Sequence, residues 1–195
     1  MLRSLLLLAP LFGAGCASAP LHPAYDDESA PTATTGFPQD WVGAWEGAVA
    51  WTAAGEPRDG FSMRLEIAPT EDPTRYAWTI VYSGAAGEDR REYSLVVRDA
   101  ERAHYAIDEH NGFGGQDGIV LEAQLHGTTL HTWFELGGTW LSIRQERVGS
   151  GEQARILHEL LSASGDPTTS GPERARVRSF LPTSQQRAEL RRVER

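Results

Sequence analysis

The stretch 119-IVLEAQLHGTTLHTWFELGGTWLSI-143 contains three short segments in which apolar and polar residues alternate. Alternation with a period of two is typical of β-strands that bury one face. Gly127-Thr128 separates the first two segments and suits a tight two-residue hairpin turn. A turn at this position places Leu125 opposite Leu130.

The second turn, Gly137-Gly138, places Phe134 opposite Leu141 and Thr132 opposite Ile143. The two turns are assigned independently, yet they put the same apolar residues on one face of one sheet. Because a slip of one residue would reverse every side chain, this agreement indicates the register. The stretch therefore predicts an antiparallel meander with one buried face.

The same pattern extends over most of the chain between Trp41 and Arg147. It predicts eight strands, which include residues 45–51, 61–67, 76–82, 93–97, 105–107, 119–125, 130–134 and 141–143. Short links predict an up-and-down order, and closure into a barrel would remove both sheet edges. We therefore expect an all-β fold, an eight-stranded antiparallel up-and-down barrel over residues 40–148.

Residues 149–165 are expected to form a C-terminal helix that packs on the outside of the barrel. Its apolar residues fall on one helical stripe: Ile156, Leu157, Leu160 and Leu161. Trp133 and Trp140, on the predicted outer face, are candidates for the contact with this helix. Residues 166–195 are expected to be a loosely ordered basic tail, weakly helical over residues 184–195.

The N-terminus has a charged start, an apolar run over residues 4–12, and then Gly-Ala-Gly before Cys16, the chain's single cysteine. This pattern is typical of a secretory signal, and the run is shorter than the roughly 20 residues that span a bilayer. The ending resembles the lipobox of bacterial lipoproteins, which implies a signal peptide over residues 1–15. It also implies a cysteine that carries acyl chains such as palmitate, followed by a flexible tether to residue 39. The resemblance further implies an outer-membrane anchor facing the periplasm; an ordinary signal peptide cut near Ala17 or Ala19 is the alternative.

Gly43-Ala44-Trp45, at the head of the first predicted strand, resembles the Gly-x-Trp signature of lipocalins. That family combines an eight-stranded meander with a following helix, as expected here. The resemblance implies an arginine near the end of the last strand that packs over Trp45, and Arg144 and Arg147 are the candidates. Residues 43–47 are also similar to the opening of nitrobindin-like haem-binding barrels.

Composition excludes several classes of function. The 18 basic residues are all arginine, and 27 acidic residues bring the formal net charge to −9. The absence of lysine excludes Schiff-base chemistry, and an acidic body argues against nucleic-acid binding. Residues 172–195 differ, with seven arginines and three acids. This end is expected to be solvated, or alternatively to contact anionic lipid or an acidic partner.

A barrel of about eight strands holds one small ligand or is filled by its own side chains. Inward residues expected to contact a ligand are Trp45, Tyr76, Trp78, Tyr82, Tyr105 and Phe134. The leading expectation is non-enzymatic binding of a small apolar or amphipathic molecule, such as a lipid or a haem-like group, in the cell envelope. No cofactor, metal or catalytic residue is predicted.

The segment between His104 and Gly118 is expected to form a lip at one mouth of the barrel. Its candidate ligand contacts are Asp108, Glu109, His110 and Asn111. Alternative interpretations are a divalent metal held by His104, Asp108 and His110, or acid–base chemistry on a lipid-like substrate by Asp108, Glu109 and His110.

A second candidate face carries His131, Trp133, Trp140 and Arg144. If it lined the cavity, it would offer aromatic walls and an anion-binding guanidinium. The opposite face is more uniformly apolar, which favours placing this face outside. The alternative function is accordingly an envelope interaction or scaffold protein whose barrel is filled and which binds a protein partner through its surface.

Overall fold

The computed structural model describes residues 36–109 and 118–194. Regular structure in these residues consists of β-strands and three short 3-10 turns. The strands are β1 (Gly43–Ala53), β2 (Glu56–Pro57), β3 (Phe61–Pro69), β4 (Arg75–Gly84), β5 (Gly87–Asp99), β6 (His104–Glu109), β7 (Ile119–His126), β8 (Thr129–Leu136), β9 (Thr139–Val148), β10 (Arg155–Ser164), β11 (Thr168–Ser170), β12 (Val177–Ser179) and β13 (Pro182–Val193). The turns are η1 (Gln39–Trp41), η2 (Gly151–Gln153) and η3 (Glu173–Ala175).

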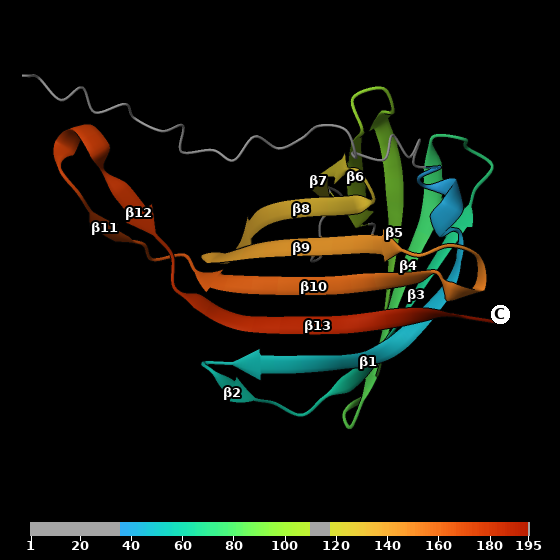
Figure 1. Cartoon of the computed structure of the whole chain (residues 1–195), viewed down its shortest axis with the longest axis horizontal. Coiled ribbons are helices and arrows are strands. Elements are labelled where there is room, and N and C mark those ends of the chain that lie inside the picture. The colour runs from blue at the N-terminus through green and yellow to red at the C-terminus, as the bar shows by residue number, and fades with distance from the viewer. Residues whose placement is uncertain (1–35, 110–117, 195) are drawn as a thin grey trace, which may run out of the picture. The chain divides into compact units, whose positions relative to one another are not determined.

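Ten of the strands form one closed antiparallel barrel (Figure 1). Their order is β13-β10-β9-β8-β7-β6-β5-β4-β3-β1, and β13 also pairs with β1, which closes the ring. β2 is a short addition beside β1, and β11 and β12 form a separate hairpin. Closure pairs both edges of the sheet, as the pattern of alternation predicted.

The predicted strands and their register are confirmed where the structure tests them. Each of the eight expected strand positions falls within an observed strand. Leu125 pairs with Leu130 across the first turn. Across the second turn, Phe134 pairs with Leu141 and Thr132 with Ile143. The strand count is wrong, however, because the barrel has ten strands and not eight.

The predicted C-terminal helix is wrong, because residues 155–164 form β10, paired with β9 on one side and β13 on the other. Apolar residues at 156, 157, 160 and 161 fit a helical stripe, but they divide equally between the two faces of a strand. Ile156 and Leu160 face the interior, whereas Leu157 and Leu161 are half-buried on the outside. Trp133 and Trp140 therefore have no helix to contact.

The segment predicted as a loose basic tail contains the strand that closes the barrel. Residues 184–193 lie in β13, where Ala188 and Leu190 are buried and the charged residues beside them are exposed. Apolar and polar residues do alternate in this segment, but the apolar positions of the alternation are only Ala188 and Leu190. Backbone pairing with β1 and β10 supplies the rest of the order.

One end of the barrel is packed with aromatic side chains. η1 places Trp41 against Trp78, with ring centroids 6.3 Å apart, and Phe37 meets Tyr105 at 4.8 Å. The indole N–H of Trp45 donates to the Trp41 carbonyl at 2.8 Å. These large side chains fill this half of the interior.

The arginine over the signature tryptophan comes from β13. The Arg192 guanidinium lies 4.4 Å from the centre of the Trp45 ring and donates to the Val42 carbonyl at 3.1 Å. Arg144 and Arg147, the two predicted candidates, lie on β9 and do not occupy this position. The prediction was right about the contact and wrong about the residue, because the true last strand was not recognised.

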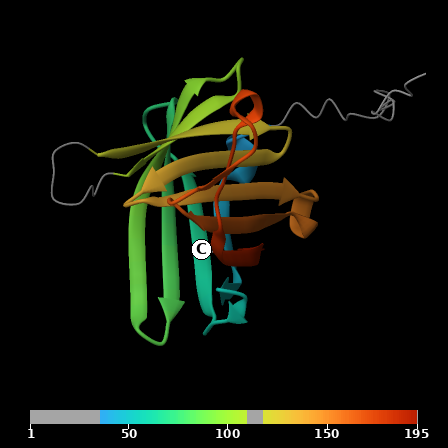
Figure 2. The same ribbon diagram turned by 90° about the vertical axis from the view of Figure 1, so that its left-hand side faces the viewer.

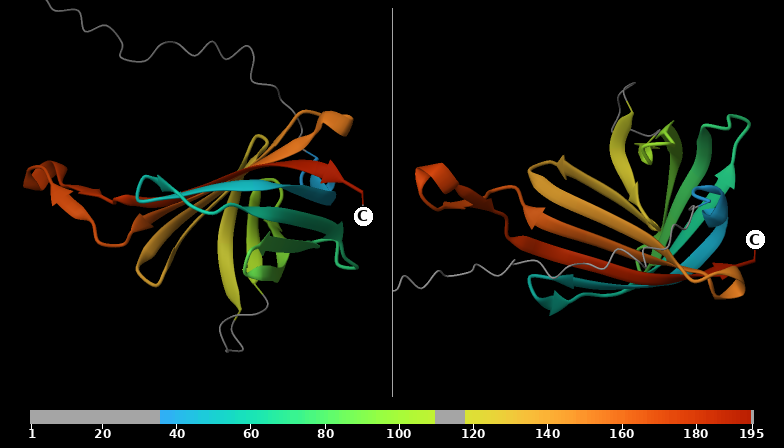
Figure 3. Two further views of the ribbon diagram at one scale, coloured as in Figure 1. Left: turned by 90° about the horizontal axis from the view of Figure 1, so that it is seen from below. Right: turned by 45° about the horizontal axis from the view of Figure 1, so that its top comes forward.

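The other half of the barrel is more open. Inward residues there are half-buried: Tyr82, Tyr93, Phe134, Ile143 and Leu160. In this half the pairing of β7 with β8 stops at Ala123 and Thr132, so the wall of the barrel is incomplete here. Figure 2 shows that β3, β4 and β5 cross the direction of β8, β9 and β10 steeply. Figure 3 shows that the β11–β12 hairpin extends from the end of β10 and β13 that lies away from η1.

Candidate functional site

The predicted ligand-contacting aromatics all lie on inward-facing positions, but in different halves of the barrel. Trp45, Tyr76, Trp78 and Tyr105 are buried within the packed half. Tyr82 and Phe134 are half-buried in the open half. The first group is therefore part of the core, whereas the second group is partly exposed, with Tyr82 also packed against that core.

A row of polar side chains crosses the interior between these halves. Thr132 on β8, Gln145 on β9 and His158 on β10 are all at most 4% exposed. His158 pairs in register with Gln145 on one side and Ala188 on the other, which places its side chain inside the barrel. This row forms the boundary between the aromatic core and the open half.

Three interior nitrogens are buried without a hydrogen-bond partner among the described residues: Trp51 Nε1, Arg147 Nε and His158 Nε2. They lie on β1, β9 and β10, and strand alternation points all three side chains inward. Buried polar groups in proteins are nearly always paired, so three unpaired ones in one interior are unusual. They mark where an acceptor or an ordered water would be stabilised.

His158 is neutral at physiological pH. Burial lowers the pKa of its imidazole from 6.5 to about 4, because the charged ring would lose its hydration. The Gln145 amide nitrogen lies 3.4 Å from His158 Nδ1 and can only donate, so Nδ1 accepts. The neutral ring then carries its proton on Nε2, which is the nitrogen that lacks a partner.

A cation lies at the open end of the interior. Arg91 faces inward from β5, with its guanidinium 5.2 Å from the centre of the Tyr82 ring. Its Nε donates to Asp89 at 2.9 Å. Burial raises the pKa of the Tyr82 phenol to about 12, so the phenol stays protonated as a donor. The open half therefore combines aromatic surface with donors at its rim.

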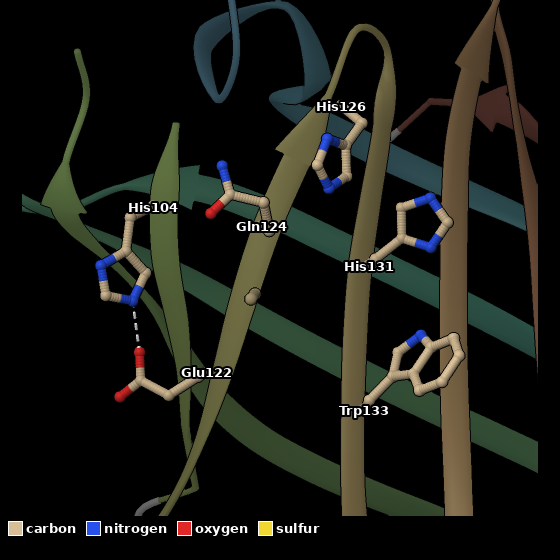
Figure 4. Close-up of a pocket in the computed structure, with 7 residues that line it drawn as sticks. His104, Glu122, Gln124, His126, His131 and Trp133 are labelled. Carbon is tan, nitrogen blue, oxygen red and sulfur yellow. Dashed lines mark hydrogen bonds and ion pairs between the residues drawn. The ribbon is translucent and has the colours of Figure 1, made fainter. Parts of the chain in front are cut away.

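The outer wall carries a groove of about 490 Å³ over β6, β7 and β8 (Figure 4). Its lining comprises His104, Glu122, Ala123, Gln124, His126, His131 and Trp133. His104 Nε2 lies 2.5 Å from the Glu122 carboxylate, and the His126 and His131 rings meet edge-on at 5.7 Å. Burial, followed by the charges of His126 and Arg144, lowers the pKa of His131, so this ring is neutral at pH 7.

The face of His131, Trp133, Trp140 and Arg144 points outward, as the more apolar opposite face had indicated. His131 pairs in register with Arg144 and Trp133 with Ser142, as the register predicted from the Gly137-Gly138 turn requires. Trp133 is 72% exposed, and Arg144 forms an ion pair with Glu146. Only His131 and Trp133 of this set line the outer groove.

The predicted lip is only partly described. Asp108 faces outward and pairs with Arg75 at 3.1 Å, while Glu109 faces inward opposite Tyr93. His110 and Asn111 lie outside the described residues, as does Cys16. Within residues 36–109 and 118–194 no group of three or more histidine, cysteine or acidic side chains has a geometry that could hold a metal.

Sequence reasoning missed His158, Gln145 and Trp51 as interior polar groups. His158 and Ile156 are two residues apart, and this alternation was available as a signal. The four leucines and isoleucines of residues 152–163 favoured a helix instead. Trp51 lies within the first predicted strand, but nothing in the sequence shows that its indole nitrogen lacks a partner.

The class of fold is an all-β closed antiparallel barrel of ten strands. One solved structure that resembles it is a protein of unknown function from the DUF3598 family of Nostoc punctiforme, with 13% sequence identity and a TM-score of 0.43. The match covers 80% of this chain and 48% of that one, so the chain spans about half the length of its neighbour. No protein-family model and no curated protein matches the chain.

Among the residues that the structure describes, none lies in a helix with the length and apolar character needed to cross a lipid bilayer.

Proposed function

We propose that the open half of the barrel binds a small amphipathic molecule whose polar end meets His158. The observation that carries this proposal is the inward Nε2 of His158, which is buried and unpaired. Leaving such a group without a partner costs about 1–3 kcal/mol, and an acceptor on a ligand would recover much of it. Because the ring is neutral, a carbonyl or carboxylate oxygen is the acceptor that fits.

The apolar part of the ligand would lie along the half-buried interior residues. Ile143, Leu160 and Phe134 offer aliphatic and aromatic surface, and Tyr82 lies on a facing part of the wall. Burial of apolar area contributes about 25 cal/mol per Å² removed from water. A polar end at the floor of the open half and an apolar body toward its mouth give the ligand one orientation.

A haem-like group is a second candidate, favoured by the same histidine. Neutral imidazole is the form that coordinates iron, and an inward histidine had not been recognised in the sequence. Coordination by Nε2 would require the proton to move to Nδ1. Gln145 would then have to present its amide oxygen to Nδ1 in place of its nitrogen.

The test uses adjacent residues that face opposite sides of β10. The Leu160→Trp variant places an indole in the open half, whereas Leu161→Trp places it on the outer wall. The full-length chain is titrated with 11-(dansylamino)undecanoic acid, and the increase in dansyl fluorescence is measured. We expect saturable binding that Leu160→Trp weakens at least about tenfold and Leu161→Trp leaves unchanged.

The same proteins and the variant His158→Leu are titrated with haemin. A sharp Soret band that His158→Leu abolishes would identify the ligand class as haem-like. If neither the dansyl acid nor haemin binds the wild-type chain, the interior function is wrong. The alternative, an interaction protein with a filled barrel, is favoured by the outer groove around Trp133 and His131. Chemical crosslinking to a partner from Trp133→Cys would then be the relevant experiment.

We also propose, from the lipobox resemblance alone, that the chain is anchored in the bacterial cell envelope through lipidated Cys16. Metabolic labelling with a palmitate analogue tests this directly. Incorporation into the wild-type chain and its loss in Cys16→Ala are expected. Labelling of neither chain would favour a secreted protein processed by an ordinary signal peptidase. Equal labelling of both would mean that the acyl chain is attached at a residue other than Cys16.

A further inference from the structure

The exposed apolar side chains of this barrel are gathered near one end. Among the described residues, the large hydrophobic side chains that are exposed are Val120, Trp133, Leu136, Trp140, Val177 and Leu181. Five of them lie on β8 and β9 near the turn that joins these strands, and on the segment that links β10 to β13, whereas Val120 lies on β7 beyond the point where its pairing with β8 ends. The end near η1 contributes none of them.

Trp133, Trp140 and residues of the linking segment form one surface. On the outer face, Trp133 pairs with Ser142 and Glu135 with Trp140, so the two indoles are diagonal neighbours on adjacent strands. The Phe180 ring meets the Trp140 ring at 5.6 Å. The Leu181 carbonyl accepts from the Ser164 amide at 2.9 Å, which holds the linking segment against β10. We call this surface, with Phe180, the apolar rim.

Arginines accompany the apolar rim. Arg174, Arg176 and Arg178 are exposed on the hairpin segment, and none of them pairs with a carboxylate among the described residues. The Arg178 guanidinium lies 5.8 Å from the centre of the Phe180 ring. Residues 168–181 contain these three arginines and one acid, Glu173, in a chain whose net charge is −9. The charge here is therefore locally opposite to that of the whole molecule.

We propose that the apolar rim docks on the surface of an anionic lipid bilayer. Tryptophan suits the boundary between headgroups and acyl chains, because its indole is apolar in body and polar at one atom. Valine and leucine at a hairpin insert into the acyl region, and guanidinium groups pair with lipid phosphates. Glu135 and Asp166 oppose the arginines, so insertion of the apolar side chains supplies most of the binding.

A lipid surface fits this combination better than a protein partner does. The centres of protein interfaces are depleted of charge, whereas here arginines alternate with apolar residues along one hairpin. Docking does not require a ligand in the barrel interior, so this inference goes beyond the function proposed above. The two can fail separately, because one is read by interior binding and the other by the position of surface tryptophans.

The experiment measures tryptophan fluorescence of the full-length chain on vesicles of phosphatidylcholine and phosphatidylglycerol, with and without bromine on the acyl chains. Bromine quenches only indoles that reach the acyl region. Two of the six tryptophans belong to the rim, so quenching of up to about one third of the emission is expected. An anchor elsewhere in the chain would bind vesicles without producing this quenching of Trp133 and Trp140.

The variant Val177→Ser/Leu181→Ser should reduce the quenching at least about threefold. Arg176→Gln/Arg178→Gln should reduce the quenching on anionic vesicles. The matched pair Arg98→Gln/Arg102→Gln, on exposed arginines near the end of β5 and in the β5–β6 connection, should not. Equal quenching with brominated and ordinary lipid, or no difference between rim and control variants, would overturn the proposal. Dimers of the wild-type chain in the absence of lipid that Leu181→Ser dissociates would assign the rim to a second copy of the chain and overturn it as well.

Discussion

Burial of His158 makes the stability of the barrel depend on pH in a way that one substitution can isolate. The unfolded chain holds this imidazole in water with a pKa near 6.5, and the folded chain lowers it to about 4. A base whose pKa is lowered by folding binds more protons in the unfolded state. Its contribution to stability is therefore fully present above pH 6.5 and is lost as the pH falls toward 4.

The magnitude follows from the two pKa values. Protonation of the unfolded chain lowers the free energy of unfolding by about 2 kcal/mol between pH 8 and pH 5, and by about 3 kcal/mol once the pH is below 4. Replacement of His158 by Gln removes this term. The difference in unfolding free energy between wild type and His158→Gln should therefore change by about 2 kcal/mol across that range.

The assay is urea unfolding of the full-length chain at pH 5, 6, 7 and 8, followed by circular dichroism. His126→Gln is the matched control, because that side chain is exposed on the outer wall and folding does not take it out of water. The free energy of unfolding of this control should change with pH as that of the wild type does. A His158→Gln difference that is flat to within about 0.5 kcal/mol from pH 8 to pH 5 would refute the assignment of a buried neutral ring.

Two further substitutions test the closure of the barrel. A Cβ on Gly47 would lie 2.2 Å from the Glu189 carbonyl oxygen on β13. Gly47→Ala should therefore lower the free energy of unfolding, measured in urea, by about 1–3 kcal/mol. An unchanged unfolding midpoint would contradict this close approach of the two strands. Arg192→Met removes the contact with the Trp45 ring and the hydrogen bond to the Val42 carbonyl, and should cost about 1–2 kcal/mol in the same assay. Retention of most of that stability in Arg192→Lys but not in Arg192→Met would show that the cation matters.

The sequence predicted most of the barrel because period-two alternation and glycine turns are local signals. Leu125 and Leu130, or Phe134 and Leu141, could be paired from the turns between them without any knowledge of the rest of the chain. β10 and β13 could not be assigned in this way. The leucines of β10 satisfy two periodicities at once, and β13 buries only Ala188 and Leu190. β13 takes its conformation from β1 and β10, which are distant in sequence, and β10 has one such distant partner in β13.

Less of the candidate site than of the barrel could be predicted from the sequence, because the site also depends on contacts between distant parts of the chain. The aromatic residues Trp45 and Trp78 were correctly placed inside, yet whether an inward residue fills a core or borders open space depends on how the barrel is packed at each end. The role of His158 depended on recognising β10. Once the strand is known, its spacing from Ile156 places it in the interior, but its unpaired nitrogen is a property of three-dimensional packing.

The pairing of β1 with β13 has a consequence for how the chain folds. Ala44 pairs with Val193 and Ala53 with Ser184. β1 therefore obtains its second partner strand only when residues 184–193 reach it. Contacts of such long sequence separation form late and slow the folding of β-proteins. Until residues 182–193 arrive, β1 and β10 present open edges that can pair with other chains. A chaperone that shields these two edges would protect the protein most during this interval.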